Sequence, residues 1–217
     1  MKIKNIFFDF DGVIAESVTA KTEAFKEMYA KYGNEVVKKV EEYHLNHGGV
    51  SRFEKFVYWE KIFFGRTLST EQVEQMASTF SRLVLKKVIN APEVPGANAF
   101  IQKYSKTLRF WIITGTPTNE IELIAYNRNL TEFFIGVHGS PKNKKYWTEF
   151  LIKKYKLNRN ETLFLGDATT DRDAALFSKL HFALRENEEN KALFIDYTGV
   201  SFKDFFELEK NLGEYFI

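Results

Sequence analysis

The chain has 217 residues, of which 44% are hydrophobic and 28% charged, as in an ordinary globular protein of one large domain with room for a smaller insertion. Its net charge of +2 gives no electrostatic reason to expect a nucleic-acid partner, and the absence of cysteine excludes disulfides and thiolate chemistry. No apolar run approaches the roughly 20 residues that span a bilayer. We therefore expect a cytoplasmic protein with neither a membrane nor a nucleic-acid partner.

The first predicted element is a buried strand, from Ile3 to Phe10, that ends in the tetrapeptide Asp9-Phe10-Asp11-Gly12. Its continuous apolar character indicates burial on both faces, as in a parallel sheet covered by helices. Gly12 permits a sharp turn where the strand stops. Because α/β proteins bind ligands at such strand ends, two carboxylates there suggest metal binding or covalent chemistry.

The segment 16–90 lacks a convincing core strand and is predicted to be a helical insertion. One helix is expected from Ser17 to Tyr32, before Gly33. A second begins at Ser51, where Ser51-x-x-Glu54 is typical of a capping box before the apolar residues Phe53, Phe56, Val57 and Phe63. A third begins near Ser69, with Gln72 three residues later, and carries Val73, Met76, Ala77, Phe80, Val84 and Val88 inward.

Further buried strands are predicted after a rigid proline-rich connection at 91–96. They are Leu108 to Thr114, Phe133 to His138, Thr162 to Leu165 and, more weakly marked, His181 to Leu184. Alternation of such strands with helical stretches predicts an α/β fold, a Rossmann-like doubly wound parallel sheet. The predicted domains are a core of residues 1–15 and 91–217 and a helical domain of residues 16–90.

Polar residues follow three of these later strands. Thr114-Gly115 ends one, and Thr116-Pro117 has the pattern of an N-cap followed by proline at the first helical position, so Thr114 either binds an anion or caps its own turn. Lys142 lies in a loop after the next strand, where a single lysine carries no weight by itself. Asp167 and Asp171 follow the third; they are candidate ligands or ordinary helix caps. Their shared position at successive strand ends is what indicates a site.

The order of these parts resembles the haloacid dehalogenase superfamily. The family's four motifs match Asp9-Phe10-Asp11-Gly12, then Thr114, then Lys142, then Gly166-Asp167-Ala168-Thr169-Thr170-Asp171. The resemblance covers the whole chain, including a helical cap domain inserted after the first strand. Within the superfamily, the chain is similar to phosphoglycolate phosphatases and β-phosphoglucomutase-like phosphatases. One departure concerns the lysine, which the family usually follows with proline. Here Pro141 precedes Lys142, so Lys144 and Lys145 are alternatives to it.

The resemblance implies a phosphatase that hydrolyses a small phosphorylated metabolite, with Asp9 as the nucleophile that forms an aspartyl-phosphate. Asp11 would protonate the leaving alcohol and then activate water. Thr114 and Lys142 would hold the transferring oxygens, with Gly12 and Gly115 beside the phosphoryl group. A Mg²⁺ ion is implied, held by Asp9, Asp11 through its carbonyl, Asp167 and, directly or indirectly, Asp171.

The residues Gly48-Gly49-Val50-Ser51-Arg52 resemble a cap loop of sugar-phosphate mutases and related phosphatases. Ser51 and Arg52 are therefore predicted to bind substrate, the alternative being a helix cap and a solvated arginine. The protein is expected to be a monomer or weak dimer.

Two other functions stay open. A phosphosugar mutase of the same superfamily shares the first motif and the cap, although such mutases usually carry an acidic residue where Gly166 stands. A non-enzymatic phospho-acceptor or binding protein would also collect acids, a hydroxyl and a lysine at strand ends, but Asp-x-Asp-Gly and the helical insertion argue against it.

Overall fold

The computed structural model describes residues 2–216, and within them the sheet has six parallel strands in the order β3-β2-β1-β4-β5-β6. Their bounds are β1 Asn5–Phe8, β2 Arg109–Pro117, β3 Gly136–Ser140, β4 Thr162–Gly166, β5 His181–Arg185 and β6 Val200–Phe202. The strand order reverses between β1 and β4, which makes their carboxyl ends the expected ligand crevice. The predicted Rossmann-like α/β class is confirmed.

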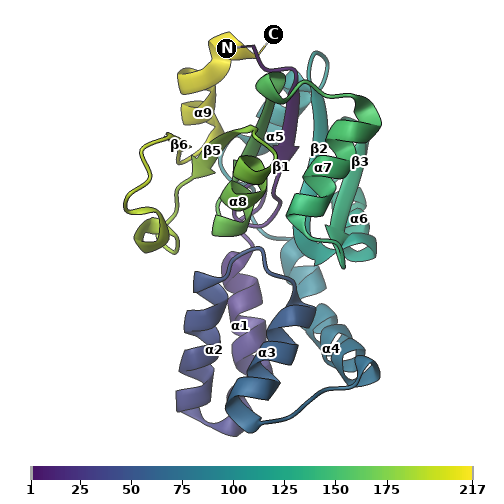
Figure 1. Ribbon diagram of the computed structural model, residues 1–217, viewed down its shortest axis with the longest axis vertical. Coiled ribbons are helices and arrows are strands. Elements are labelled where there is room, and N and C mark those ends of the chain that lie inside the picture. The colour runs from purple at the N-terminus through teal and green to yellow at the C-terminus, as the bar shows by residue number, and fades with distance from the viewer. Residues whose placement is uncertain (1, 217) are drawn as a thin grey trace.

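Helices cover both faces of the sheet (Figure 1). Phe7 of β1 packs in a cluster with α7 (Lys144–Tyr155) and α8 (Thr169–Phe177). Its neighbour Phe8 belongs to a second cluster with α5 (Ala97–Tyr104), α6 (Thr118–Asn127) and α9 (Phe205–Leu212). Successive side chains of a strand point to opposite faces, so the unbroken apolar run of β1 fills both layers.

The remaining helices form a bundle below the sheet in Figure 1. Their bounds are α1 Val18–Tyr29, α2 Asn34–Asn46, α3 Arg52–Phe64 and α4 Thr70–Ile89. Buried aromatic side chains of α1, α3 and α4 make its core, with Phe25 and Phe80 rings 4.1 Å apart and Trp59 edge-on to Phe25. All four helices fall inside the segment predicted to be the cap, which we call the cap from here on.

Short 3₁₀ turns complete the described chain, at Ala30–Tyr32, Thr131–Phe133, Arg159–Glu161, Lys191–Phe194 and Gly213–Tyr215. Helix α2 and strand β6 had no sequence prediction. Helix α2 buries only Val40 and His44, and β6 has three residues at the sheet edge, so neither carries a strong apolar pattern. The turn at 131–133 displaces β3 toward the C-terminus from the predicted 133–138.

The predicted helix starts differ in their outcomes. Ser69 and Gln72 form the predicted capping box of α4. Ser51 is the N-cap of α3, but the Glu54 side chain accepts from the Ser51 hydroxyl instead of the Ser51 backbone. Of the apolar residues that follow this N-cap, Phe56 is buried, whereas Val57 is 48% exposed on α3.

Candidate active site

The buried carboxylate of Asp9 lies just beyond the last residue of β1. Its Oδ1 accepts the Phe10 backbone N–H at 2.7 Å, which orients the group toward the end of the sheet. Gly12 has φ +76°, and a Cβ there would collide with the Asp167 carboxylate. Only glycine therefore lets the loop after β1 lie against the loop after β4.

The lysine that contacts Asp9 is Lys144. Its Nζ lies 2.7 Å from Asp9 Oδ2 and 2.6 Å from Asp171 Oδ1, and all three side chains are buried. The choice of Lys142 is corrected: this residue is exposed, and its ammonium lies over the Tyr146 ring. The physical reason is that α7 begins at Lys144 after the N-cap Asn143, so Lys142 remains in the solvent-facing loop.

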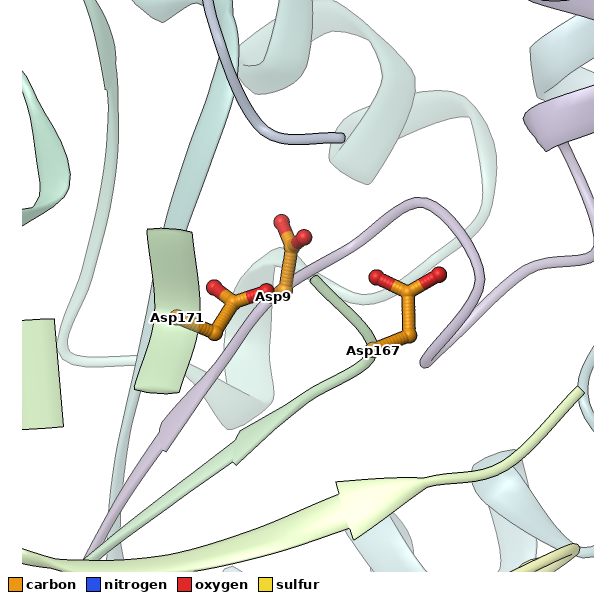
Figure 2. Close-up of side chains that lie close together, drawn as sticks. All are labelled: Asp9, Asp167 and Asp171. Carbon is orange, nitrogen blue, oxygen red and sulfur yellow. The ribbon is translucent and has the colours of Figure 1, made fainter. Parts of the chain in front are cut away.

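Three acids lie together beside this lysine. Asp9, Asp167 and Asp171 each offer a carboxylate oxygen, and these oxygens all lie within 4.8 Å of one another. In Figure 2 the Asp9 side chain stands between those of Asp171, from α8, and Asp167, from the loop after β4. Buried carboxylates at this spacing fit a hard divalent cation such as Mg²⁺, which prefers oxygen ligands.

The electrostatics of the acid cluster support the same interpretation. Burial and the Asp9 charge raise the pKa of Asp171 to about 7, although Lys144 opposes this shift. Burial, Asp9 and Asp171 together raise the pKa of Asp167 well above its ordinary value. Burial lowers the pKa of Lys144, but Asp171 and Asp9 outweigh it, so the net shift is upward. One ammonium, that of Lys144, thus faces three carboxylates, and a bound cation would supply the positive charge that the cluster still lacks.

Asp11 stands apart from the cluster of Asp9, Asp167 and Asp171 and is held by three neighbours. Its carboxylate accepts from Ser17 Oγ at 2.5 Å, from Thr116 Oγ1 at 3.2 Å and from the Lys21 ammonium of α1. Burial raises the pKa of Asp11, but the charge and hydrogen bond of Lys21, with the two hydroxyls, lower it overall. Lys21 was not predicted, because nothing in a helical pattern marks one lysine as facing a strand end 10 residues earlier.

The predicted Thr114 is buried in β2, three residues before the end of the strand, and lines a cavity between the sheet edge and the cap. Its Oγ1 accepts the Thr116 N–H at 3.3 Å. The predicted N-cap at Thr116 is wrong by one residue, because β2 continues to Pro117, which pairs with Ser140, and α6 begins at Thr118. Beside it, a Cβ on Gly115 would lie 2.6 Å from the Gly49 carbonyl oxygen, so glycine allows the cap loop to approach β2.

Arg52 does not face solvent. It is 4% exposed, and its two terminal nitrogens bind the two Glu120 oxygens of α6 at 2.8 and 2.9 Å. The guanidinium also donates to Ser81 of α4 at 2.6 Å and lies over the Phe80 ring. It lines the cavity, whereas Ser51 caps α3 and lies outside the cavity lining.

A cavity of about 90 Å³ lies between the sheet edge and the cap. The sheet contributes Asp9, Asp11, Thr114 and Asp167, and the cap contributes Lys21, His44, Arg52 and Lys55. Acidic groups therefore form one wall and basic groups the other. The cap residues His44 and Lys55 were not predicted, because the apolar pattern of their helices indicates packing and does not mark a polar residue that faces a cavity.

Two asparagines that sequence reasoning also missed hold Asp167 in place. Asn190 Nδ2 donates to the Asp167 carbonyl at 2.8 Å, and Asn187 Nδ2 lies 3.3 Å from Asp167 Oδ2. Both come from the loop after β5.

Across residues 2–216, no helix has the length and apolar character needed to cross a bilayer.

The fold and this site define an α/β protein whose switch-point crevice holds a buried carboxylate–lysine cluster beneath a helical cap. The chain belongs to the haloacid dehalogenase-like hydrolases, whose family model matches residues 3–176. No curated protein matches it in sequence.

Solved structures share the fold at low identity. A putative β-phosphoglucomutase from Bacteroides vulgatus is 18% identical with a TM-score of 0.78, over 99% of this chain and 89% of its own. A β-phosphoglucomutase from Clostridium difficile is 18% identical with a TM-score of 0.77, over 99% and 97%. A putative phosphoglycolate phosphatase from Lactobacillus plantarum is 16% identical with a TM-score of 0.75, over 97% and 99%. These similarities concern the fold.

Proposed function

We propose that the protein is a Mg²⁺-dependent phosphatase that hydrolyses a small phosphorylated metabolite through an aspartyl-phosphate on Asp9. The observation that carries this proposal is the contact of Asp9 with Lys144 inside a buried cluster of acids. Family membership supports hydrolysis, and structures sharing the fold include one described as a phosphoglycolate phosphatase.

The chain's own residues account for the two displacement steps. Asp9 attacks phosphorus and the ester P–O bond breaks, while Asp11 gives a proton to the leaving alcohol oxygen. Because Lys21 helps to keep the pKa of Asp11 low in the free protein, we expect Asp11 to take up this proton when the negatively charged substrate binds beside it. Water then attacks the phosphorus of the acyl phosphate, Asp11 takes its proton, and Asp9 is released with inorganic phosphate. Lys144 contacts Asp9 and offsets negative charge as the phosphoryl group approaches, and Thr114 lines the same cavity.

The residues that would hold Mg²⁺ are Asp9, Asp167 and Asp171, with the Asp11 carbonyl as a further oxygen ligand. When bound, the ion would neutralise charge on the phosphoryl oxygens. Asn187 and Asn190 position Asp167 for this role.

A phosphosugar mutase is the alternative within the family. A Cβ at Gly166 would collide with the Asp171 side chain, so this arrangement has no space for the acidic residue that such mutases carry there. Glucose 6-phosphate formed from β-glucose 1-phosphate would support the mutase, and free phosphate would support the phosphatase. A phosphoenzyme that lasts many minutes would instead support a phospho-acceptor.

The test is release of inorganic phosphate from a panel of phosphorylated metabolites with Mg²⁺, and with EDTA as the control. Asp9→Asn should abolish turnover, and Asp11→Asn should form a phosphoenzyme that appears and decays slowly. Asp173→Asn is the matched control, because Asp173 is exposed two residues beyond Asp171. Steady-state phosphatase activity in Asp9→Asn would contradict the proposal.

A further inference from the structure

Lys55 differs from the other cations around the cavity. It is 1% exposed on α3, yet no carboxylate lies within ion-pair distance of it among residues 2–216. Lys21 pairs with Asp11, Arg52 with Glu120, and Lys144 with Asp9 and Asp171. Lys55 is thus a buried amine on the cavity wall without a compensating negative charge.

The polar partner of Lys55 is a second buried side chain of the cap. Its Nζ lies 2.6 Å from His44 Nδ1, and His44 also lines the cavity. Burial and the charge of Lys55 lower the pKa of His44 well below its ordinary value, so the imidazole is neutral and Nδ1 accepts the bond from Lys55. The proton then sits on His44 Nε2, which is buried without a hydrogen-bond partner in the described part of the chain.

Burying the Lys55 amine without a counterion lowers the stability of the folded protein. Burial lowers the pKa of Lys55 to about 7, with Lys21 and Lys144 adding to the shift and Glu54 and Asp11 opposing it. An apolar residue would fill the same position against Phe25 without the desolvation penalty. A side chain whose pKa is shifted this far and that lies on the wall of a cleft is a candidate functional residue.

The geometry points to a second anion subsite formed by Lys55 and His44, which binds a carboxylate at the far end of the substrate. This inference rests on the proposed function, since the acid cluster and Lys144 would take the phosphoryl end. The substrate class is then a short phosphorylated carboxylic acid.

Charge and size both favour a carboxylate over the alternatives. One ammonium beside a neutral imidazole matches a single negative charge, whereas a second phosphate would bring nearly two. Sugar hydroxyls would supply none. The cavity of about 90 Å³ holds on the order of six waters, which suits a compound with a few carbon atoms.

The experiment compares two substrates that differ only at the far end. 2-Phosphoglycolate carries a carboxylate where ethyl phosphate carries a methyl group. We expect the wild type to have a KM at least about tenfold lower for 2-phosphoglycolate, as for a lost charge-assisted hydrogen bond. Lys55→Met should remove this preference, because it raises the KM for 2-phosphoglycolate about tenfold or more and the KM for ethyl phosphate much less.

Lys61→Met is the matched control, because Lys61 lies on the same helix with an exposed side chain and should keep the wild-type preference. Equal KM values for the two substrates in the wild type would overturn the subsite, whatever the variant does. An equal fall in kcat/KM for the two substrates in Lys55→Met would also overturn the subsite.

A binding measurement tests the subsite without turnover. Titration calorimetry of 2-phosphoglycolate into Asp9→Asn at pH 8, in buffers of different ionisation enthalpy, counts the protons taken up. A carboxylate next to Lys55 raises its pKa, so we expect proton uptake that Asp9→Asn/Lys55→Met lacks. Equal uptake by both proteins would exclude Lys55, and the other groups facing it (His44, Lys21, Glu54, Asp11 and Lys144) are common to both.

The two proposals fail differently. If the wild type releases phosphate from ethyl phosphate with Mg²⁺ but shows no preference for the carboxylate, only the subsite is lost. If it releases phosphate from no phosphomonoester, the proposed function itself is overturned.

Discussion

Two lysines two positions apart have opposite surroundings. Lys144 is the first residue of α7 and touches Asp9 and Asp171, whereas Lys142 is exposed over Tyr146. The difference arises from the N-cap at Asn143, which turns the chain into the helix between them. Sequence position alone therefore indicates an amine that lies outside the acid cluster, whereas the amine two residues later contacts Asp9.

Replacing these lysines separates their roles. Lys144→Met should lower kcat by about a hundredfold or more, the loss typical of one charged group next to the reacting phosphoryl oxygens. Lys142→Met should stay within about twofold of the wild type, as for an exposed side chain. Steady-state phosphate release on one substrate measures both, and a larger loss in Lys142→Met would contradict the assignment.

Lys21 acts on the proposed acid–base residue through charge. Because its ammonium helps to lower the pKa of Asp11, Lys21→Met should raise that pKa. If protonated Asp11 is the general acid, the alkaline limb of the kcat/KM profile should then move to higher pH. A pH–rate profile that keeps its alkaline limb in place would show that Lys21 does not position or tune Asp11.

At the scale of elements, a buried ion pair joins the cap to the sheet domain. Arg52 of α3 binds Glu120 of α6 through two nitrogens, and Ser81 of α4 completes the group by donating to Glu120 at 2.8 Å. The contact holds the cap above the carboxyl ends of the strands. The guanidinium predicted to bind substrate is thus neutralised by the protein itself.

Removing one partner should therefore destabilise the fold. Glu120→Gln leaves the Arg52 charge buried without its counterion, so we expect the free energy of unfolding to fall by about 3–5 kcal/mol. Urea unfolding measures the change. Glu188→Gln, in the exposed pair with Lys191, is the control and should lie within about 0.5 kcal/mol of the wild type. Equal urea midpoints for Glu120→Gln and the wild type would show that the buried ion pair does not contribute to the stability of the fold.

At the scale of the whole molecule, the acid cluster makes folding stability, and the affinity of the proposed metal site, depend on pH. The pKa of Asp171 is about 7 and that of Asp167 is also raised, both above their unfolded values. The folded state therefore holds extra protons, and their contribution to stability is present at low pH and lost as pH rises through about 7. A cation must displace these protons, so its affinity should increase with pH.

Thermal unfolding with Mg²⁺ or EDTA tests this linkage. The upward shift of Tm caused by Mg²⁺ should be larger at pH 8 than at pH 6, with apparent affinity increasing up to about tenfold per pH unit for each proton displaced. In Asp167→Asn the shift should be largely lost. A Tm that does not respond to Mg²⁺ at either pH would argue against a metal site at these acids.

The amino-acid sequence by itself determined the fold class and the general position of the site. Unbroken apolar runs such as Ile6-Phe7-Phe8 specify strands buried on both faces, and the polar residues after each run must then meet at one edge of the sheet. Local chemistry also predicted the start of α4, because a capping box involves only Ser69 and Gln72.

Tertiary structure alone decided which charged side chains face one another. The contacts of Arg52 with Glu120 and of Lys21 with Asp11 depend on how the cap docks over the sheet domain. The contact of Lys144 with Asp9 depends on how α7 packs against the sheet, and that of Lys55 with His44 depends on how α3 packs against α2 inside the cap. A helical pattern shows which face of a helix is buried but carries no information about which side chain of another element that face will meet. Long-range charge pairing is a property of packing, so the sequence could locate the site without predicting its basic wall.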